Sequence, residues 1–170
     1  ISSQILQKPW MIVTSIFLHA DIMHLVYNMF ALALFGLVLE GIVGRKRFLL
    51  IFFTAGILAS IGSLFLYKAS LGASGAIFGI LGTLALLRPN MQVFVGFFPM
   101  PMIVAAVVWV IGDIIGLFAP SSVANLAHII GLAVGVGYGL YLRKGFGEHR
   151  RNVYPIDDKE LEDWERKYMR

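Results

Sequence analysis

Long apolar stretches, separated by short loops that hold most of the charges, constrain this chain more than any other feature. A helix needs about 20 mostly apolar residues to cross a bilayer, with a range of about 17 to 25. Only 14% of the 170 residues are charged and 58% are hydrophobic, whereas soluble domains carry roughly a quarter charged residues. We therefore predict an all-α, polytopic membrane helix bundle. Its five predicted spans are about 23–43, 48–67, 74–87, 101–118 and 125–142.

Basic residues orient these spans, because Lys and Arg concentrate in short loops on the cytoplasmic side of a membrane. If the loop at 44–47 is cytoplasmic, every Lys and Arg except Lys8 and Lys68 falls on that side. Residues 1–144 then form a membrane core that starts with an outer loop remnant, 1–22, and residues 145–170 form a polar cytoplasmic tail. No export signal precedes this outer start. We therefore expect a further transmembrane helix upstream of residue 1.

Composition also limits the classes of site and partner. The chain has no cysteine, which excludes disulfides and cysteine-based metal sites. Its net charge of +4 resides in short loops and the tail, a distribution that does not suggest nucleic-acid binding. The partner that the composition predicts is the lipid bilayer.

Strongly polar side chains at membrane depth are costly and are functional candidates by default. Five of them fall in the predicted spans, and all but Asn28 lie near the outer ends of their helices. These five are His24, Asn28, Ser74, Asp113 and His128. The helices therefore offer polar groups at a similar depth on one side of the membrane. To Asp113 we assign a structural role, either bonding a loop or lining a cavity.

The pair His24 and Asn28 has the spacing i, i+4, which places both side chains on one face of a helix. Two hydrogen-bond donors aimed at one point suit the developing negative oxygen of a tetrahedral intermediate. An interhelical hydrogen bond that holds the bundle together is the alternative.

Ser74 lies in Gly72-Ala73-Ser74-Gly75, where a loop enters a helix. Unpaired backbone N–H groups and the positive end of the helix dipole favour an anion there. Alternatively, Ser74 is an N-cap, or one small residue in a packed face that includes Gly79 and Gly82. The span has 14 residues, which rise only about 21 Å in a core of about 30 Å, so Ser74 would lie roughly 10 Å below the outer surface. Hydrolysis at this depth needs a water-filled cavity.

His128 opens the fifth span, and Gly131, Gly135 and Gly139 follow it at four-residue intervals. Two helices with glycine faces are natural packing partners. Their packing would bring the outer ends together, and with them Ser74 and His128. A serine beside a neutral imidazole is the minimal activated nucleophile.

Three short motifs occur in order on the first, third and fifth spans. They are His24-x-x-x-Asn28, Gly72-Ala73-Ser74-Gly75, and Ala127-His128 with Gly131 and Gly135. This pattern resembles the signature motifs of the rhomboid family of intramembrane serine proteases, prokaryotic type, and the resemblance covers about Trp10 to Leu142. The five spans match helices two to six of that family's six-helix core, as if the first were missing.

The resemblance implies that Ser74 is the nucleophile and His128 the general base. They would form a dyad without a third, acidic member. It implies an oxyanion hole made by His24, Asn28 and the backbone N–H of Ser74, and it requires neither metal nor cofactor. The reaction would be cleavage of transmembrane segments of other membrane proteins near their outer ends. The site would open to the outer side of the cell membrane.

Further positions take supporting roles by the same resemblance, namely Gly72, Gly75, Phe78 and Gly131. Many members have a tyrosine where this chain has Phe78, so the ring can stack on the histidine but its hydroxyl is lost. Tyr27 and Trp109 are candidates for a lateral substrate gate, and residues 120–124 resemble the loop that caps the site.

Three alternatives remain. A catalytically inactive rhomboid-like protein that binds transmembrane clients would typically lack the serine or the histidine. A transporter would show paired charges near the midplane or broken helices. A metal site of His19, His24 and His128 lacks a carboxylate on the same face.

Overall fold

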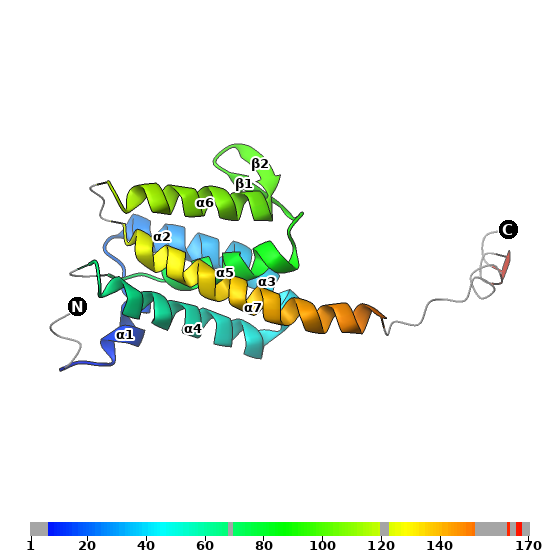
Figure 1. Cartoon of the computed structure of the whole chain (residues 1–170), viewed down its shortest axis with the longest axis horizontal. Coiled ribbons are helices and arrows are strands. Elements are labelled where there is room, and N and C mark those ends of the chain that lie inside the picture. Colours follow the sequence, from blue (N-terminus) through cyan, green and yellow to red (C-terminus); the bar gives the residue numbers. More distant parts are fainter. Residues whose placement is uncertain (1–6, 68–69, 120–122, 152–162, 164–165, 168–170) are drawn as a thin grey trace.

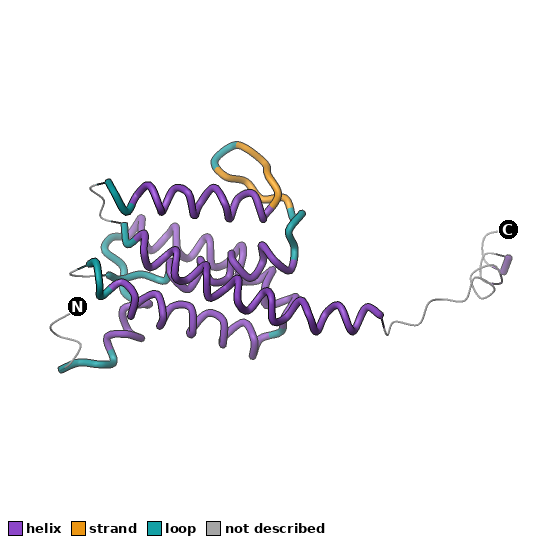
Figure 2. Tube along the Cα trace, viewed as in Figure 1, coloured by secondary structure: helices purple, strands orange, loops and turns teal. Residues whose placement is uncertain are grey.

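The computed structural model describes residues 7–67, 70–119, 123–151, 163 and 166–167. Its core is a bundle of helices that run side by side, with the loops gathered at the two ends (Figure 1). Figure 2 shows that the described core is almost entirely helical, apart from one small hairpin of two strands. This arrangement confirms the predicted all-α, polytopic class.

The main helices lie close to the five predicted spans. The first is a continuous helix made of α2 (Ile22–Ala31), a π-helical turn η2 (Leu32–Gly36) and α3 (Leu37–Val43). The others are α4 (Arg45–Ser63), α5 (Ser74–Leu87), α6 (Met102–Gly116) and α7 (Asn125–Arg151). The first helix, α4 and the segment Asn125–Arg143 are long and apolar enough to cross a membrane, while α5 and α6 are shorter apolar helices.

Two boundaries differ from expectation. Helix α4 ends at Ser63, four residues before the predicted end of its span, and a turn follows. Helix α7 continues to Arg151, beyond the predicted end at residue 142. No proline occurs in this stretch of the sequence, and the glycines in it weaken a helix by only about 1 kcal/mol each.

A β-hairpin, which the sequence analysis did not predict, lies between the third and fourth predicted spans. Strands β1 (Gln92–Val95) and β2 (Phe98–Pro101) pair antiparallel, with Val95 opposite Phe98. The two residues between them begin with Gly96, whose positive φ of 63° suits a tight hairpin turn. The hairpin lies beside the first turns of α6 (Figure 1).

Helix α5 occupies the centre of the bundle, and nearly all of its residues from Gly75 to Ala85 are buried. Its most extensive interface is with α7, as the matching glycine spacing predicted. A Cβ added at Gly131 would lie 2.0 Å from the carbonyl oxygen of Gly75, and one at Gly135 equally close to that of Gly79. The backbones of α5 and α7 are thus in direct contact, which places their first residues side by side.

Two short turns, α1 (Met11–Thr14) and η1 (Ser15–Phe17), give structure to the predicted outer loop remnant. Ile16 is fully buried and inserts against Gly56 of α4, where a Cβ would meet its side chain at 2.7 Å. The backbone N–H of Gly72 donates to the carbonyl of Ser15 at 2.9 Å. The remnant therefore supports the loop that leads into α5.

Candidate active site

Ser74 is the first residue of α5, and its side chain does not cap the helix. The N-cap is Ala73, and the first intrahelical bond runs from the N–H of Ile77 to the carbonyl of Ala73. Gly72 has a φ of +113°, a conformation that favours glycine. The loop thus leaves the hydroxyl of Ser74 free of the helix, and the N-cap alternative is wrong.

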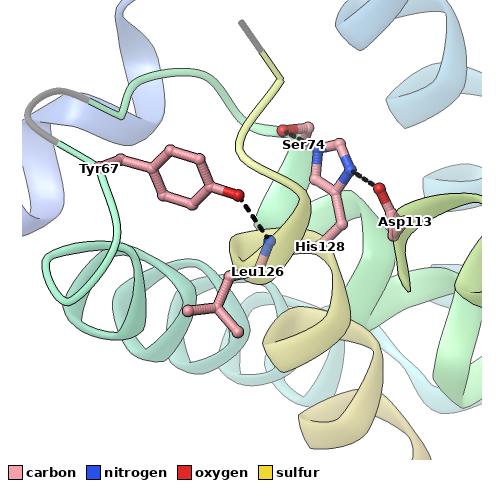
Figure 3. A network of polar contacts seen from close by, with 5 residues as sticks. All are labelled: Tyr67, Ser74, Asp113, Leu126 and His128. Carbon is pink, nitrogen blue, oxygen red and sulfur yellow. Dashed lines mark hydrogen bonds and ion pairs between the residues drawn. The ribbon is translucent and has the colours of Figure 1, made fainter. Parts of the chain in front are cut away.

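Ser74 and His128 are in hydrogen-bond contact, with 2.9 Å between Oγ and Nε2 (Figure 3). They stand at adjoining ends of α5 and α7, which the contact of Gly75 with Gly131 holds together. The hydroxyl of Tyr67 accepts a bond from the N–H of Leu126 at 3.3 Å, which ties the start of α7 to the segment that follows α4. A hydroxyl and an imidazole at this separation have the geometry that a nucleophile and its general base require.

Asp113 contacts the opposite side of the same imidazole. Its Oδ1 lies 3.0 Å from Nδ1 of His128, so the ring stands between a hydroxyl and a carboxylate (Figure 3). Asp113 is buried, at 7% exposure, and comes from α6. The expectation that Asp113 bonds a loop or merely lines a cavity is therefore wrong, because its carboxylate contacts His128. Depth alone could not reveal which face of α6 turns toward α7.

A cavity of about 610 Å³ borders Ser74 and His128. It lies at the end of the bundle where α2, α5 and α7 begin. Its polar lining side chains are Asp21, His24, Tyr27, Ser70, Ser74 and His128. A water molecule occupies about 30 Å³ in the liquid, so the cavity has ample room for water at the predicted site of hydrolysis.

His24 lies on this cavity, and its position depends on two local contacts. Asp21 caps α2 by accepting the N–H of His24 at 2.8 Å. The ring of His24 packs on Gly72, where a Cβ would lie only 2.8 Å from Nε2. Its Nδ1 accepts a long bond, 3.4 Å, from the N–H of Ala20. A neutral ring that accepts at Nδ1 carries its proton on Nε2, the nitrogen beside the loop of Ser74.

Asn28 is buried one turn further along α2, but it does not line the cavity. Its Nδ2 donates to the carbonyl of His24 at 2.8 Å, and its Oδ1 has no partner among the described residues. One of the two amide hydrogens is therefore used within the helix, while the other is left for a second acceptor.

The two aromatic residues expected to form a gate, Tyr27 and Trp109, have different surroundings. Tyr27 is exposed and lines the cavity. Trp109 packs edge to face on Phe35 at 6.2 Å and on Phe78 at 6.4 Å. Trp109 of α6 thus makes its aromatic contact with the first helix through Phe35, which belongs to the π-helical turn. In the expected cap loop, residues 120–122 lie outside the described part of the chain.

His19 stands at the edge of the site, with its ring edge to face on His24 at 5.1 Å. Burial lowers the pKa of His19 below its ordinary value, and the charge of nearby His24 lowers the pKa further. Within the described residues, no three His, Asp or Glu side chains are grouped as metal ligands.

Sequence reasoning missed two polar partners, Tyr67 and Asp113. Tyr67 forms a hydrogen bond with Leu126, a residue 59 positions away. No local sequence pattern predicts such a contact. Asp113 did carry a signal, because a carboxylate inside an apolar helix requires a partner. The position of that carboxylate near the outer end of its span was the available clue to His128.

The family model of the Rhomboid domain matches residues 6–145. Rhomboid protease GluP of Bacillus subtilis is 40% identical over 128 residues, which are 74% of this chain and 24% of that protein. RHOMBOID-like protein 6, mitochondrial, of Arabidopsis thaliana is 37% identical over 152 residues, or 85% of this chain and 48% of that protein. Rhomboid protein 1, mitochondrial, of Saccharomyces cerevisiae is 32% identical over 165 residues, with shares of 86% and 47%. The chain thus spans less than half the length of each of these relatives.

Proposed function

This chain belongs to the rhomboid family and is an integral membrane protein, and from that premise we propose that it is an intramembrane serine endopeptidase. Its substrates would be transmembrane segments of other membrane proteins, cut near their outer ends. The observation that carries the proposal is the 2.9 Å contact between Oγ of Ser74 and Nε2 of His128 at the wall of a cavity.

The reaction follows from the order of these groups. Ser74 Oγ attacks the peptide carbonyl carbon while Nε2 of His128 takes its proton. The tetrahedral intermediate collapses, His128 gives that proton to the leaving amine, and an ester to Ser74 remains. Water from the cavity then attacks the ester, with His128 taking a proton from the water and returning it to Oγ.

The negative oxygen of the intermediate needs donors beside Ser74. The N–H groups at the start of α5 are free of intrahelical bonds because the helix supplies no acceptor for them. His24 presents Nε2 on the same side, above Gly72. Asn28 would contribute its second amide hydrogen, the one not used within the helix. Preorganised donors of this kind each contribute about 10²–10³ in rate in other serine hydrolases.

The membrane supplies the geometry of substrate access. The site would open to the outer side, and the C-terminal segment would be cytoplasmic, as the distribution of Lys and Arg predicts. Tyr27 at the cavity and the contact of Trp109 with Phe35 lie on the two helices between which a substrate would enter. An inactive client-binding relative is the alternative, and the intact contact of Ser74 with His128 argues against it.

Covalent labelling tests the proposal directly. The full-length protein in detergent is treated with a fluorophosphonate probe, beside the variants Ser74→Ala and His128→Ala. We expect labelling of the unaltered protein only, because phosphonylation needs both the nucleophile and its base. Thermal unfolding of the three proteins shows whether the variants fold. Labelling that persists in folded Ser74→Ala, or that never occurs in the folded full-length protein, would contradict the proposal.

A further inference from the structure

Asp113 is the one buried residue in the outer half of α6. Helix α6 buries Met102, Ala105 and Ala106 near its start, and from residue 107 to 116 only Asp113 is buried. The neighbouring side chains of Ile111, Ile114 and Ile115 are exposed, as expected for a face in contact with lipid. The one buried residue of this otherwise apolar segment is thus a carboxylate.

Burial of a carboxylate is costly unless the group is paired and hydrogen-bonded. Among the described residues, the polar partner of Asp113 is Nδ1 of His128, and Oδ2 of Asp113 has none. A group that served only to join α6 to α7 would be replaced at lower cost by an apolar contact. The burial of Asp113 therefore points to a function exerted on His128.

This function is to determine which ring nitrogen of His128 carries the hydrogen. A neutral imidazole carries its hydrogen on one nitrogen and accepts at the other. An ionised carboxylate can only accept, so a bond to Asp113 requires the hydrogen of His128 to reside on Nδ1. Nε2 then presents a lone pair to the hydroxyl of Ser74, 2.9 Å away. The opposite tautomer would point a hydrogen at Ser74 and could not take its proton.

We propose that Asp113 is a positioning residue, which holds His128 in its Nδ1–H tautomer and stabilises the imidazolium formed during each acyl transfer. The proposal rests on the proposed function for its catalytic consequence, but its structural part concerns the tautomer alone. Asp113 does not line the cavity, and it acts through His128. The site is on this view a relay of Ser74, His128 and Asp113, drawn from helices α5, α7 and α6.

Two measurements test this role. The first is ¹⁵N NMR of histidine-labelled protein in nanodiscs, with the signals of His128 identified through His128→Gln. We expect the proton on Nδ1 in the unaltered protein and a shift toward Nε2 in Asp113→Asn, because the amide can donate to Nδ1. A proton on Nε2 in the unaltered protein, or an unchanged tautomer in Asp113→Asn, would overturn the proposal whether or not the protein is a protease.

The second measurement separates kcat from KM for cleavage of a reporter transmembrane segment in liposomes. Asp113→Asn is expected to lower kcat by at least about tenfold, which is less than the roughly 10²-fold minimum contributed by a general base itself. KM should stay within about twofold of its original value. Gly112→Ala is the matched control on the adjacent residue, since a Cβ there meets nothing within 4 Å, and it should leave both constants unchanged. Equal kcat in Asp113→Asn, or a loss of kcat that only follows a loss of folded protein, would refute the positioning role. Failure of the proposed function itself would show differently, as no cleavage and no dependence on Ser74.

Discussion

The imidazole of His128 lies face to face with the phenyl ring of Phe78, with ring centroids 4.3 Å apart and ring planes 6° from parallel. Phe78 follows Ser74 by one helical turn on α5, so the helix that carries the proposed nucleophile also carries the ring that packs on its base. The stack expected for this position is present, and its ring carries no hydroxyl. The face of His128 is therefore held by packing, and its two edges by Ser74 and Asp113.

Phe78→Leu tests the value of this stack. The change keeps an apolar side chain of similar size but removes the flat ring, whose stacking contributes about 0.5–1.5 kcal/mol beyond area burial. We expect the rate of fluorophosphonate labelling to fall about 2- to 10-fold. Phe78→Tyr retains the ring and should label at close to the original rate. Equal rates in all three proteins would mean that the stack does not orient His128.

Gly135→Ala tests the contact between α5 and α7. A Cβ at this position would lie 2.0 Å from the carbonyl oxygen of Gly79, so the helices must separate. Overpacking of this kind costs about 1–3 kcal/mol, and we expect a lower unfolding temperature in detergent. Gly137→Ala is the matched control on the same helix, because nothing lies within 4 Å of its added Cβ. A destabilisation equal to that of the control would contradict the close approach of the two backbones.

Gly72→Ala tests the loop before Ser74. The residue has a φ of +113°, and a Cβ would lie 2.8 Å from the ring of His24. Because a displacement of about 1 Å near reacting atoms can reduce rates about 10²-fold, we expect a loss of kcat/KM of at least about tenfold. Gly41→Ala, in open space on α3, should retain full cleavage of the same reporter. Full activity in Gly72→Ala would show that His24 does not depend on this glycine.

The lowered pKa of His19 predicts a dependence of stability on pH. In the unfolded chain His19 has the ordinary histidine pKa of about 6.5. Below that pH the unfolded state therefore binds a proton at His19 more readily than the folded state does. Stability is therefore lost as the pH falls through about 6.5 and is fully present above it. We expect the unfolding temperature to drop on acidification, and to drop less in His19→Gln. An identical pH dependence in the two proteins would assign the effect to other groups.

The sequence alone determined the helical class, the approximate spans and the pairing of α5 with α7. These properties depend on local composition, because a backbone in lipid must satisfy its own hydrogen bonds, and glycine spacing marks where helices can touch. The proximity of Ser74 and His128 followed from the same pattern. The structure confirms this proximity with a contact of 2.9 Å.

Only the tertiary structure decided which face each helix turns toward its neighbours. Asp113 and His128 have similar predicted depths, but their contact requires one particular rotation of α6. The same holds for Trp109, which packs on Phe35 and Phe78, and for Tyr67, which bonds Leu126. The rotation of an apolar helix is set by packing with residues distant in sequence. A nearly uniform apolar surface, such as that of α6, carries little information about that rotation.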